Sequence, residues 1–182
     1  MLSTENQDQD IADNYAEISY YVEEQKIITL KMFIVLCIVS FNLYSLWWIY
    51  KEWRFFKQKE RSEIMPALMT IFSIITMASL FNKILRFAKK KGYSHNYFSI
   101  ALFCGYIIGN LLSTLSDALG LISILSFVFI IPPFKALNYA KQNSNDFIVT
   151  EQSSFNGQQI GLIIVGSIFW ILVLLGLIIG NG

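Results

Sequence analysis

Five long apolar segments alternate with short charged links along the chain. The segments cover residues 32–50, 66–81, 97–115, 118–134 and 160–179. A helix that crosses a bilayer needs about 20 apolar residues, whereas strands use about 4–8. The pattern predicts an all-α polytopic membrane protein with four to five membrane helices, which occupy one helical membrane domain over residues 32–182.

The second segment is the least certain of the five to cross. It carries hydroxyl side chains at Thr70, Ser73, Thr76 and Ser79 within its short apolar run. Segment 66–81 therefore has two interpretations, a crossing helix or a segment that lies in the interface or re-enters.

Residues 1–31 differ in charge from the rest of the chain. They contain seven acidic residues and two lysines, and no early apolar run follows a basic start, as a cleavable signal peptide would require. We expect an acidic, solvated N-terminal arm with a marginal helix near residues 11–22. A docking arm for a basic partner is the alternative.

Lysine and arginine counts predict the orientation in the membrane. Two lie before residue 32, five in residues 51–61, five in 83–91 and two in 135–141. Cytoplasmic loops are enriched in these residues. Five crossings with the N-terminus inside put nine of them inside and five outside. A non-crossing second segment with the N-terminus outside puts twelve inside and two outside, which fits the rule better. Both models place Lys83–Lys91 inside and the C-terminus on the non-cytoplasmic side.

An aromatic box follows the first segment. Trp47, Trp48, Tyr50 and Trp53 stand beside Lys51 and Arg54. Rings with one polar end and long basic side chains settle at the headgroup level. We expect interface anchors, with a lipid- or ligand-binding cage as the alternative, and a basic amphipathic helix over residues 51–65.

A second basic group comprises Arg86, Lys89, Lys90 and Lys91. Each such charge near an anionic leaflet contributes about 1 kcal/mol to binding. We expect an orientation signal that faces lipid and attracts anionic headgroups. Specific recognition of a lipid or a protein is the alternative.

The third segment ends in a polar helical face. Its members are Tyr106, Asn110, Ser113, Thr114 and Asp117. Polar groups at membrane depth usually face a partner helix or water. Hydrogen bonds between helices are the plain interpretation, and a solute or proton path is the functional one. Asn42 and Asn82 are interpreted as contacts between helices.

Two pairs of glycines stand four residues apart, Gly105 with Gly109 and Gly176 with Gly180. Small residues at this spacing let helices approach closely. The first pair predicts packing within the chain and the second predicts self-association, although such pairs also occur by chance.

The composition of the chain excludes some classes of function. Of 182 residues, 54% are hydrophobic and 15% charged, with a net charge of +1. Soluble domains have fewer apolar and more charged residues. A soluble enzyme domain and a nucleic-acid partner are therefore excluded. Cys37 and Cys104 lie in apolar segments as packing residues, and we expect no metal, no cofactor and no catalytic residue.

The order of these motifs resembles a family of small uncharacterised bacterial inner-membrane proteins. The resemblance covers about Tyr20–Gly176. Its marks here are KMFIVLCIVSFNLYSLWWIYKEW, PALMTIFSIITMASLFNKI and LSDALGLISILSFVFIIPPFKALNYAKQ. Ser45 and Leu46 replace a more acidic or aromatic pair, and Met69 or Thr70 replaces a basic residue of that family. The resemblance implies a bacterial inner membrane and no particular chemistry.

The leading hypothesis for function is a non-enzymatic accessory or scaffold component of the membrane. The expected partners are the bilayer, its anionic headgroups, and a second copy or another membrane protein. A small solute or proton transporter or channel that uses the polar face of segment 97–115 is the alternative. A membrane enzyme is weaker, because Asp117 and His95 alone supply too little chemistry.

Overall fold

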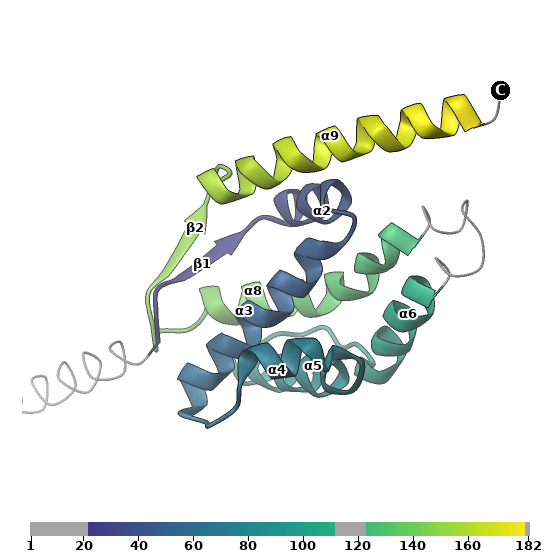
Figure 1. The fold of residues 1–182 in the computed structure, drawn as a ribbon. Coiled ribbons are helices and arrows are strands. Elements are labelled where there is room, and N and C mark those ends of the chain that lie inside the picture. Colours follow the sequence, from purple (N-terminus) through teal and green to yellow (C-terminus); the bar gives the residue numbers. More distant parts are fainter. Residues whose placement is uncertain (1–21, 112–122, 181–182) are drawn as a thin grey trace, which may run out of the picture.

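The computed structural model describes residues 22–111 and 123–180, and it is mostly helical (Figure 1). The all-α prediction is confirmed. The helices are α2 (Leu30–Val39), α3 (Leu43–Glu60), α4 (Pro66–Ile71), α5 (Ser73–Lys90), α6 (Ser99–Leu111), the 3-10 helix η2 (Ile124–Ile130), α8 (Ile131–Gln142) and α9 (Gly157–Gly180). Two short strands, β1 (Gln25–Ile28) and β2 (Val149–Gln152), pair with each other.

The strand pair brings part of the predicted N-terminal arm into the folded domain. β1 and β2 are parallel, with Gln25 opposite Val149 and Ile28 opposite Gln152. Asn138 of α8 donates from its Nδ2 to the Ile28 carbonyl at 2.9 Å, which fastens β1 to the helices. The prediction of a solvated arm is therefore wrong for Ile27 and Ile28, which are buried, whereas Lys26, Thr29 and Lys31 are exposed. Of the preceding residues of that arm, Val22 is buried and Glu23 and Glu24 are exposed, and residues 1–21 lie outside the described residues.

The first apolar segment is two helices rather than one. α2 ends at Val39 and α3 begins at Leu43, and between them Phe41 and Asn42 adopt positive φ angles of 51° and 69°. Left-handed residues end an α-helix. The Ser40 hydroxyl then accepts from the Tyr44 amide at 2.9 Å. The prediction of a single helix over 32–50 is wrong, because α3 turns back from α2 and continues through the basic residues to Glu60.

The second segment is also divided. α4 begins at Pro66, where a missing amide proton costs no helical hydrogen bond, and ends at Ile71. α5 begins at Ser73 and continues past the apolar run to Lys90. The Thr76 hydroxyl donates back to the Phe72 carbonyl at 3.1 Å, so this polar group is satisfied near the break. A single crossing helix over 66–81 is therefore absent.

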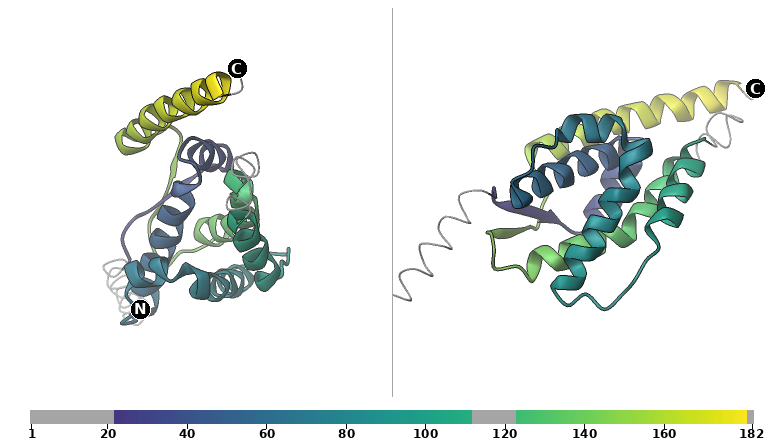
Figure 2. Two further views of the ribbon diagram at one scale, coloured as in Figure 1. Left: turned by 45° about the vertical axis from the view of Figure 1, so that its right-hand side comes forward. Right: turned by 90° about the horizontal axis from the view of Figure 1, so that it is seen from below.

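The core lies where α2, α3, α5, η2 and α8 meet, and it is rich in aromatic rings. Phe33 of α2 stacks on Phe134 of α8 at 4.5 Å between ring centroids, and meets Trp48 of α3 edge-on at 6.0 Å. Phe33 is fully buried. These rings join helices that are distant in sequence, and they fix the bundle seen from two further sides in Figure 2.

Helix α9 lies outside this bundle, along α2. A Cβ built on Gly166 would stand 2.2 Å from the Val39 carbonyl oxygen, so only glycine permits this approach. One turn further, Trp170 stacks on Phe41 at 4.7 Å, and its Nε1 donates to the Ile38 carbonyl at 3.1 Å. Figure 1 shows α9 continuing past the end of α2 along one side of the bundle.

Among the described residues, one helix is long and apolar enough to cross a membrane, over Gly157–Gly176. Its best window has a mean hydropathy of 2.4 and is 11% buried. Two further apolar helices, α2 and α6, are shorter than a crossing requires.

Candidate functional site

A buried polar cluster joins α3, α6 and η2. The Nδ2 of Asn42 and the Nδ2 of Asn110 both donate to the Ser126 hydroxyl, at 2.7 and 2.9 Å. The Tyr106 and Ser45 hydroxyls lie 3.0 Å apart, and Ser45 donates to the Asn42 carbonyl at 2.7 Å. Five polar side chains from three elements are therefore linked by hydrogen bonds in an apolar setting, although the buried Oδ1 of Asn42 has no hydrogen-bond partner among the described residues.

This cluster contains two residues of the predicted polar face, Tyr106 and Asn110. Ser113, Thr114 and Asp117 lie outside the described residues. Asn42 makes the contact between helices that its sequence position predicts, whereas Asn82 is exposed on α5. The interpretation of Asn82 as such a contact is therefore wrong. The cluster's hydrogen bonds run between helices, which is the arrangement that fixes helix positions in an apolar environment.

The side chains of the aromatic box differ in how far they are buried. Trp48 and Trp53 are 4% and 2% exposed and belong to the core, because α3 turns this face toward α2 and α8. Trp47 is 52% exposed and stacks on the half-buried Tyr50 at 5.4 Å. Of the four predicted anchors, only Trp47 and Tyr50 are at the surface. Sequence spacing alone did not distinguish the two faces, since both carry tryptophan.

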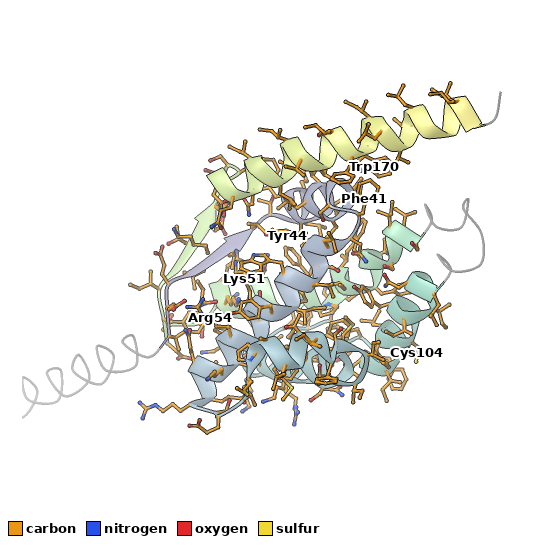
Figure 3. The ribbon with its side chains drawn as sticks, in the orientation of Figure 1. Phe41, Tyr44, Lys51, Arg54, Cys104 and Trp170 are labelled. Carbon is orange, nitrogen blue, oxygen red and sulfur yellow. The ribbon has the colours of Figure 1, made fainter. Side chains whose placement is uncertain are left out.

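Ion pairs connect the charged segments of the chain. Lys59 of α3 and Lys91 after α5 both contact Asp146, at 2.9 and 3.3 Å. Lys83 of α5 pairs with Glu60 at the end of α3, and Arg54 of α3 pairs with Glu23 before β1. Figure 3 shows Arg54 and Lys51 on the same side of the bundle, away from Phe41 and Trp170. The N-terminal strand, both basic segments and the loop after α8 therefore lie together.

One of these ion pairs is buried. The Lys141 ammonium lies 2.6 Å from Oε2 of Glu52, and each side chain is only 5% exposed. The Lys141 nitrogen also lies 4.5 Å from the centroid of the Phe55 ring. Burial lowers the pKa of Lys141 from its ordinary value, and the carboxylate of Glu52 opposes that change. Charges in such surroundings are stable only as a pair.

The predicted basic cluster borders a pocket between α3 and α5. The pocket encloses about 550 Å³ and is lined by Phe56, Lys59, Glu60, Lys83, Arg86, Phe87, Lys90, Lys91 and Asp146. Lys89 lies outside it and donates to the Ser94 carbonyl at 3.0 Å. Three of the four predicted residues therefore line a pocket rather than an open surface.

Asp146 is the anionic centre on which two of these cations meet. Partial burial raises the pKa of its carboxyl, but the hydrogen bonds and charges of Lys59 and Lys91 outweigh that effect, so the net pKa is below its ordinary value. The carboxylate is ionised at neutral pH, and it fixes both ammonium groups at the pocket wall.

The two glycine pairs have different surroundings. A Cβ on Gly105 would lie 2.4 Å from the Phe129 ring, and one on Gly109 would lie 2.8 Å from the Ser126 Cβ, so α6 packs on η2 through this face. A Cβ on Gly176 would meet nothing within 4 Å. Nothing is described of the surroundings of Gly180. Cys37 is buried and Cys104 exposed, and neither forms a disulfide.

Several residues that hold these sites together were not singled out from the sequence. They are Glu52, Asp146, Lys141, Ser126 and Gly166. A partial signal existed for Glu52, which is an acid within an otherwise basic segment, and for Gly166, which interrupts a long apolar helix. The others depend on contacts between distant segments. Within residues 22–111 and 123–180, no group of three or more His, Cys, Asp or Glu is placed to hold a metal ion.

Comparison with protein-family models, with curated proteins and with solved structures finds no match to this chain. The resemblance to small bacterial inner-membrane proteins therefore stays a prediction.

Proposed function

We propose that this chain is an integral membrane protein that serves as a non-enzymatic accessory or scaffold component, with all its lysines and arginines on one side of the bilayer. The observation that carries the proposal is the separation of charged from exposed apolar side chains. Charged residues meet in ion pairs along the second halves of α3 and α5, at the end of α8 and in the loop after it, whereas large apolar residues are exposed elsewhere.

The exposed apolar surface supports lipid as its surroundings. Ile71, Phe72, Ile74 and Ile75, where α4 meets α5, are 55–76% exposed. Soluble monomers rarely expose large continuous apolar patches. Helix α9 is apolar around its circumference, and its 24 residues extend about 36 Å, compared with about 30 Å of hydrocarbon.

The remaining apolar helices enter the bilayer without crossing it in this proposal. α2 has 10 residues and extends only about 15 Å, and the turn at Phe41–Asn42 returns the chain as α3. Segment 32–50 then forms a hairpin, and α4 with the start of α5 re-enters. This replaces both topologies considered from the sequence.

Charge placement favours this arrangement. Groups in direct contact lie on the same side of a bilayer, and Lys83–Glu60, Lys91–Asp146 and Glu23–Arg54 join the basic segments to one another and to β1. All 14 lysines and arginines then face the cytoplasm, as the positive-inside rule favours. If α9 crosses, the C-terminus is on the other side.

The hydrogen bonds of the polar cluster support the scaffold role. Its donors are engaged between α3, α6 and η2, which favours a fixed bundle over a water-filled path. We therefore favour an accessory role over the transporter or channel hypothesis. Mild detergent extraction is expected to recover the protein with a partner or as an oligomer, and recovery as a monomer alone would contradict this role.

Lipid contact is tested by fluorescence quenching. In a chain with both cysteines replaced by alanine, a bimane label is placed at Ile75→Cys or, as a control, at Asn145→Cys in the loop after α8. Both positions are exposed. Vesicles of brominated lipid are expected to quench the label at position 75 and not at 145. Equal, weak quenching at both positions would contradict a membrane-embedded α4–α5 surface.

A further inference from the structure

The pocket between α3 and α5 has a composition that selects its ligand. We propose that it binds the phosphate groups of a multiply charged anion. This goes beyond the proposed function, because a scaffold or accessory role requires no such site.

The pocket is lined by more basic than acidic side chains. Five basic side chains line the pocket, Lys59, Lys83, Arg86, Lys90 and Lys91, against two acidic ones, Glu60 and Asp146. This excess of positive charge attracts a multiply charged anion.

Two of the five cations have no ion-pair partner among the described residues. Lys59 and Lys91 contact Asp146, and Lys83 contacts Glu60. Arg86 and Lys90, one turn apart on α5, form no such pair there. They are exposed and their charges are available. Arginine presents a planar donor fork that matches phosphate oxygens, and lysine adds a point charge.

The paired cations are held in place before any ligand arrives. The Lys59 nitrogen lies 4.8 Å from the centroid of Phe87 and 5.6 Å from that of Phe147, in addition to its contact with Asp146. Fixed donors lose less conformational entropy on binding than free ones. Asp146 therefore acts as a positioning residue that sets two ammonium groups at the wall.

The volume of the pocket limits which anions can be its ligand. The pocket encloses about 550 Å³, which falls within the usual range of about 300–1,000 Å³ for small-molecule sites. This volume exceeds the need of a single phosphate and suits a diphosphate or a phosphate with an organic group, which can lie against the rings of Phe56 and Phe87. A lipid headgroup and a soluble phosphorylated compound share this chemistry.

Inorganic pyrophosphate is the probe, and isothermal titration calorimetry is the measurement. The purified full chain is placed in nanodiscs of phosphatidylcholine alone, or of phosphatidylcholine and phosphatidylglycerol in equal parts. In phosphatidylcholine alone we expect binding that weakens at high salt. Absence of binding there would overturn the proposal.

Matched variants separate a built site from general attraction. Arg86→Gln with Lys90→Gln is expected to weaken pyrophosphate binding at least about tenfold, equivalent to about 1.4 kcal/mol. Lys89→Gln with Lys135→Gln removes the same charge from exposed lysines outside the pocket and is expected to change affinity less than about twofold, or about 0.4 kcal/mol. Equal weakening in both pairs would overturn the proposal. Arg86→Lys with Lys90→Arg is expected to keep binding.

The two lipid compositions distinguish the sources of the phosphate. If phosphatidylglycerol weakens pyrophosphate binding at a salt concentration that screens the surface charge of the bilayer, its headgroup competes for the pocket and the natural ligand is a headgroup. If affinity is equal in both nanodiscs, the ligand is a soluble phosphate compound. Both results support the pocket chemistry. If the chain assembles in nanodiscs but does not bind pyrophosphate, this proposal fails and the membrane proposal stands. If the chain does not enter nanodiscs, the membrane proposal fails, and the same titration on the chain in buffer then tests the pocket.

Discussion

Removing one partner of the buried pair Glu52–Lys141 is expected to destabilise the protein strongly. The side chains are each 5% exposed and 2.6 Å apart, so loss of one leaves an uncompensated charge in a water-poor site. Such losses cost about 3–5 kcal/mol. Because burial already lowers the pKa of Lys141, that side chain can release its proton when Glu52 is neutralised. The Phe55 ring also retains part of its attraction for an ammonium that stays charged.

The two single changes are therefore expected to differ. Lys141→Met leaves a buried carboxylate and is expected to cost about 3–5 kcal/mol. Glu52→Gln is expected to cost less, about 2–3 kcal/mol, in the range for loss of a charged hydrogen bond. Glu52→Met combined with Lys141→Met removes both charges and is expected to cost less than Lys141→Met alone, because well-packed apolar pairs can replace buried ion pairs.

Reversible unfolding in detergent micelles, followed by circular dichroism with increasing denaturant, measures these free energies. The pair Lys83–Glu60 is the control, since its side chains are 26% and 42% exposed. Exposed pairs contribute about 0–1 kcal/mol. A cost below about 1 kcal/mol for Lys141→Met, or a double variant as unstable as the summed losses of Glu52→Met alone and Lys141→Met alone, would refute the assignment of a buried, coupled pair.

Three further predictions use the same unfolding assay. Ser126→Ala removes the shared acceptor of two asparagines and is expected to cost about 1–2 kcal/mol; no loss would contradict a structural role for the polar cluster. Gly166→Val is expected to cost about 1–3 kcal/mol because its side chain meets the Val39 carbonyl, whereas Gly161→Val, with nothing within 4 Å, should be nearly neutral; equal effects would contradict the contact between α9 and α2. Lysine contacts lower the pKa of Asp146, so its stabilisation, under about 1 kcal/mol, is complete above about pH 3.9 and is lost as the pH falls through the folded-state pKa. The stability difference between the unmodified chain and Asp146→Asn should therefore shrink in acid, and a constant difference would exclude this linkage.

The apolar patterns predicted which segments form helices better than they predicted where each helix ends. Apolar runs identified α2, α6 and α9 as apolar helices, but periodicity did not reveal that the chain reverses between Val39 and Leu43. Neither Phe41 nor Asn42 is a glycine, so no strong turn signal marks the positive φ angles. Strand β1 was missed for a similar reason, since a four-residue strand is defined by its partner β2 rather than by its own residues.

The candidate sites were predicted in part. The sequence identified the basic residues around the pocket, because clusters of lysine are visible without a fold. It did not identify Asp146 as the centre of two ion pairs, since the contact joins residues 87 positions apart. The polar face of α6 was recognised by its helical spacing, while its acceptor Ser126 lies on another element and was not. Contacts between distant segments decide which polar residues work together, and spacing along one helix does not contain that information.

Cysteine accessibility tests the central claim, that the charged ends of the helices share one side of the membrane. Single cysteines replace Glu24, Glu63, Ser94 and Asn145, which are exposed near the separate charged segments, in a chain without Cys37 and Cys104. An impermeant maleimide is added to intact cells and then to inverted vesicles. We predict that all four positions react only in inverted vesicles, while a cysteine at Asn181 reacts in intact cells. Reaction at position 24 or 63 in intact cells, with position 94 protected, would contradict the account.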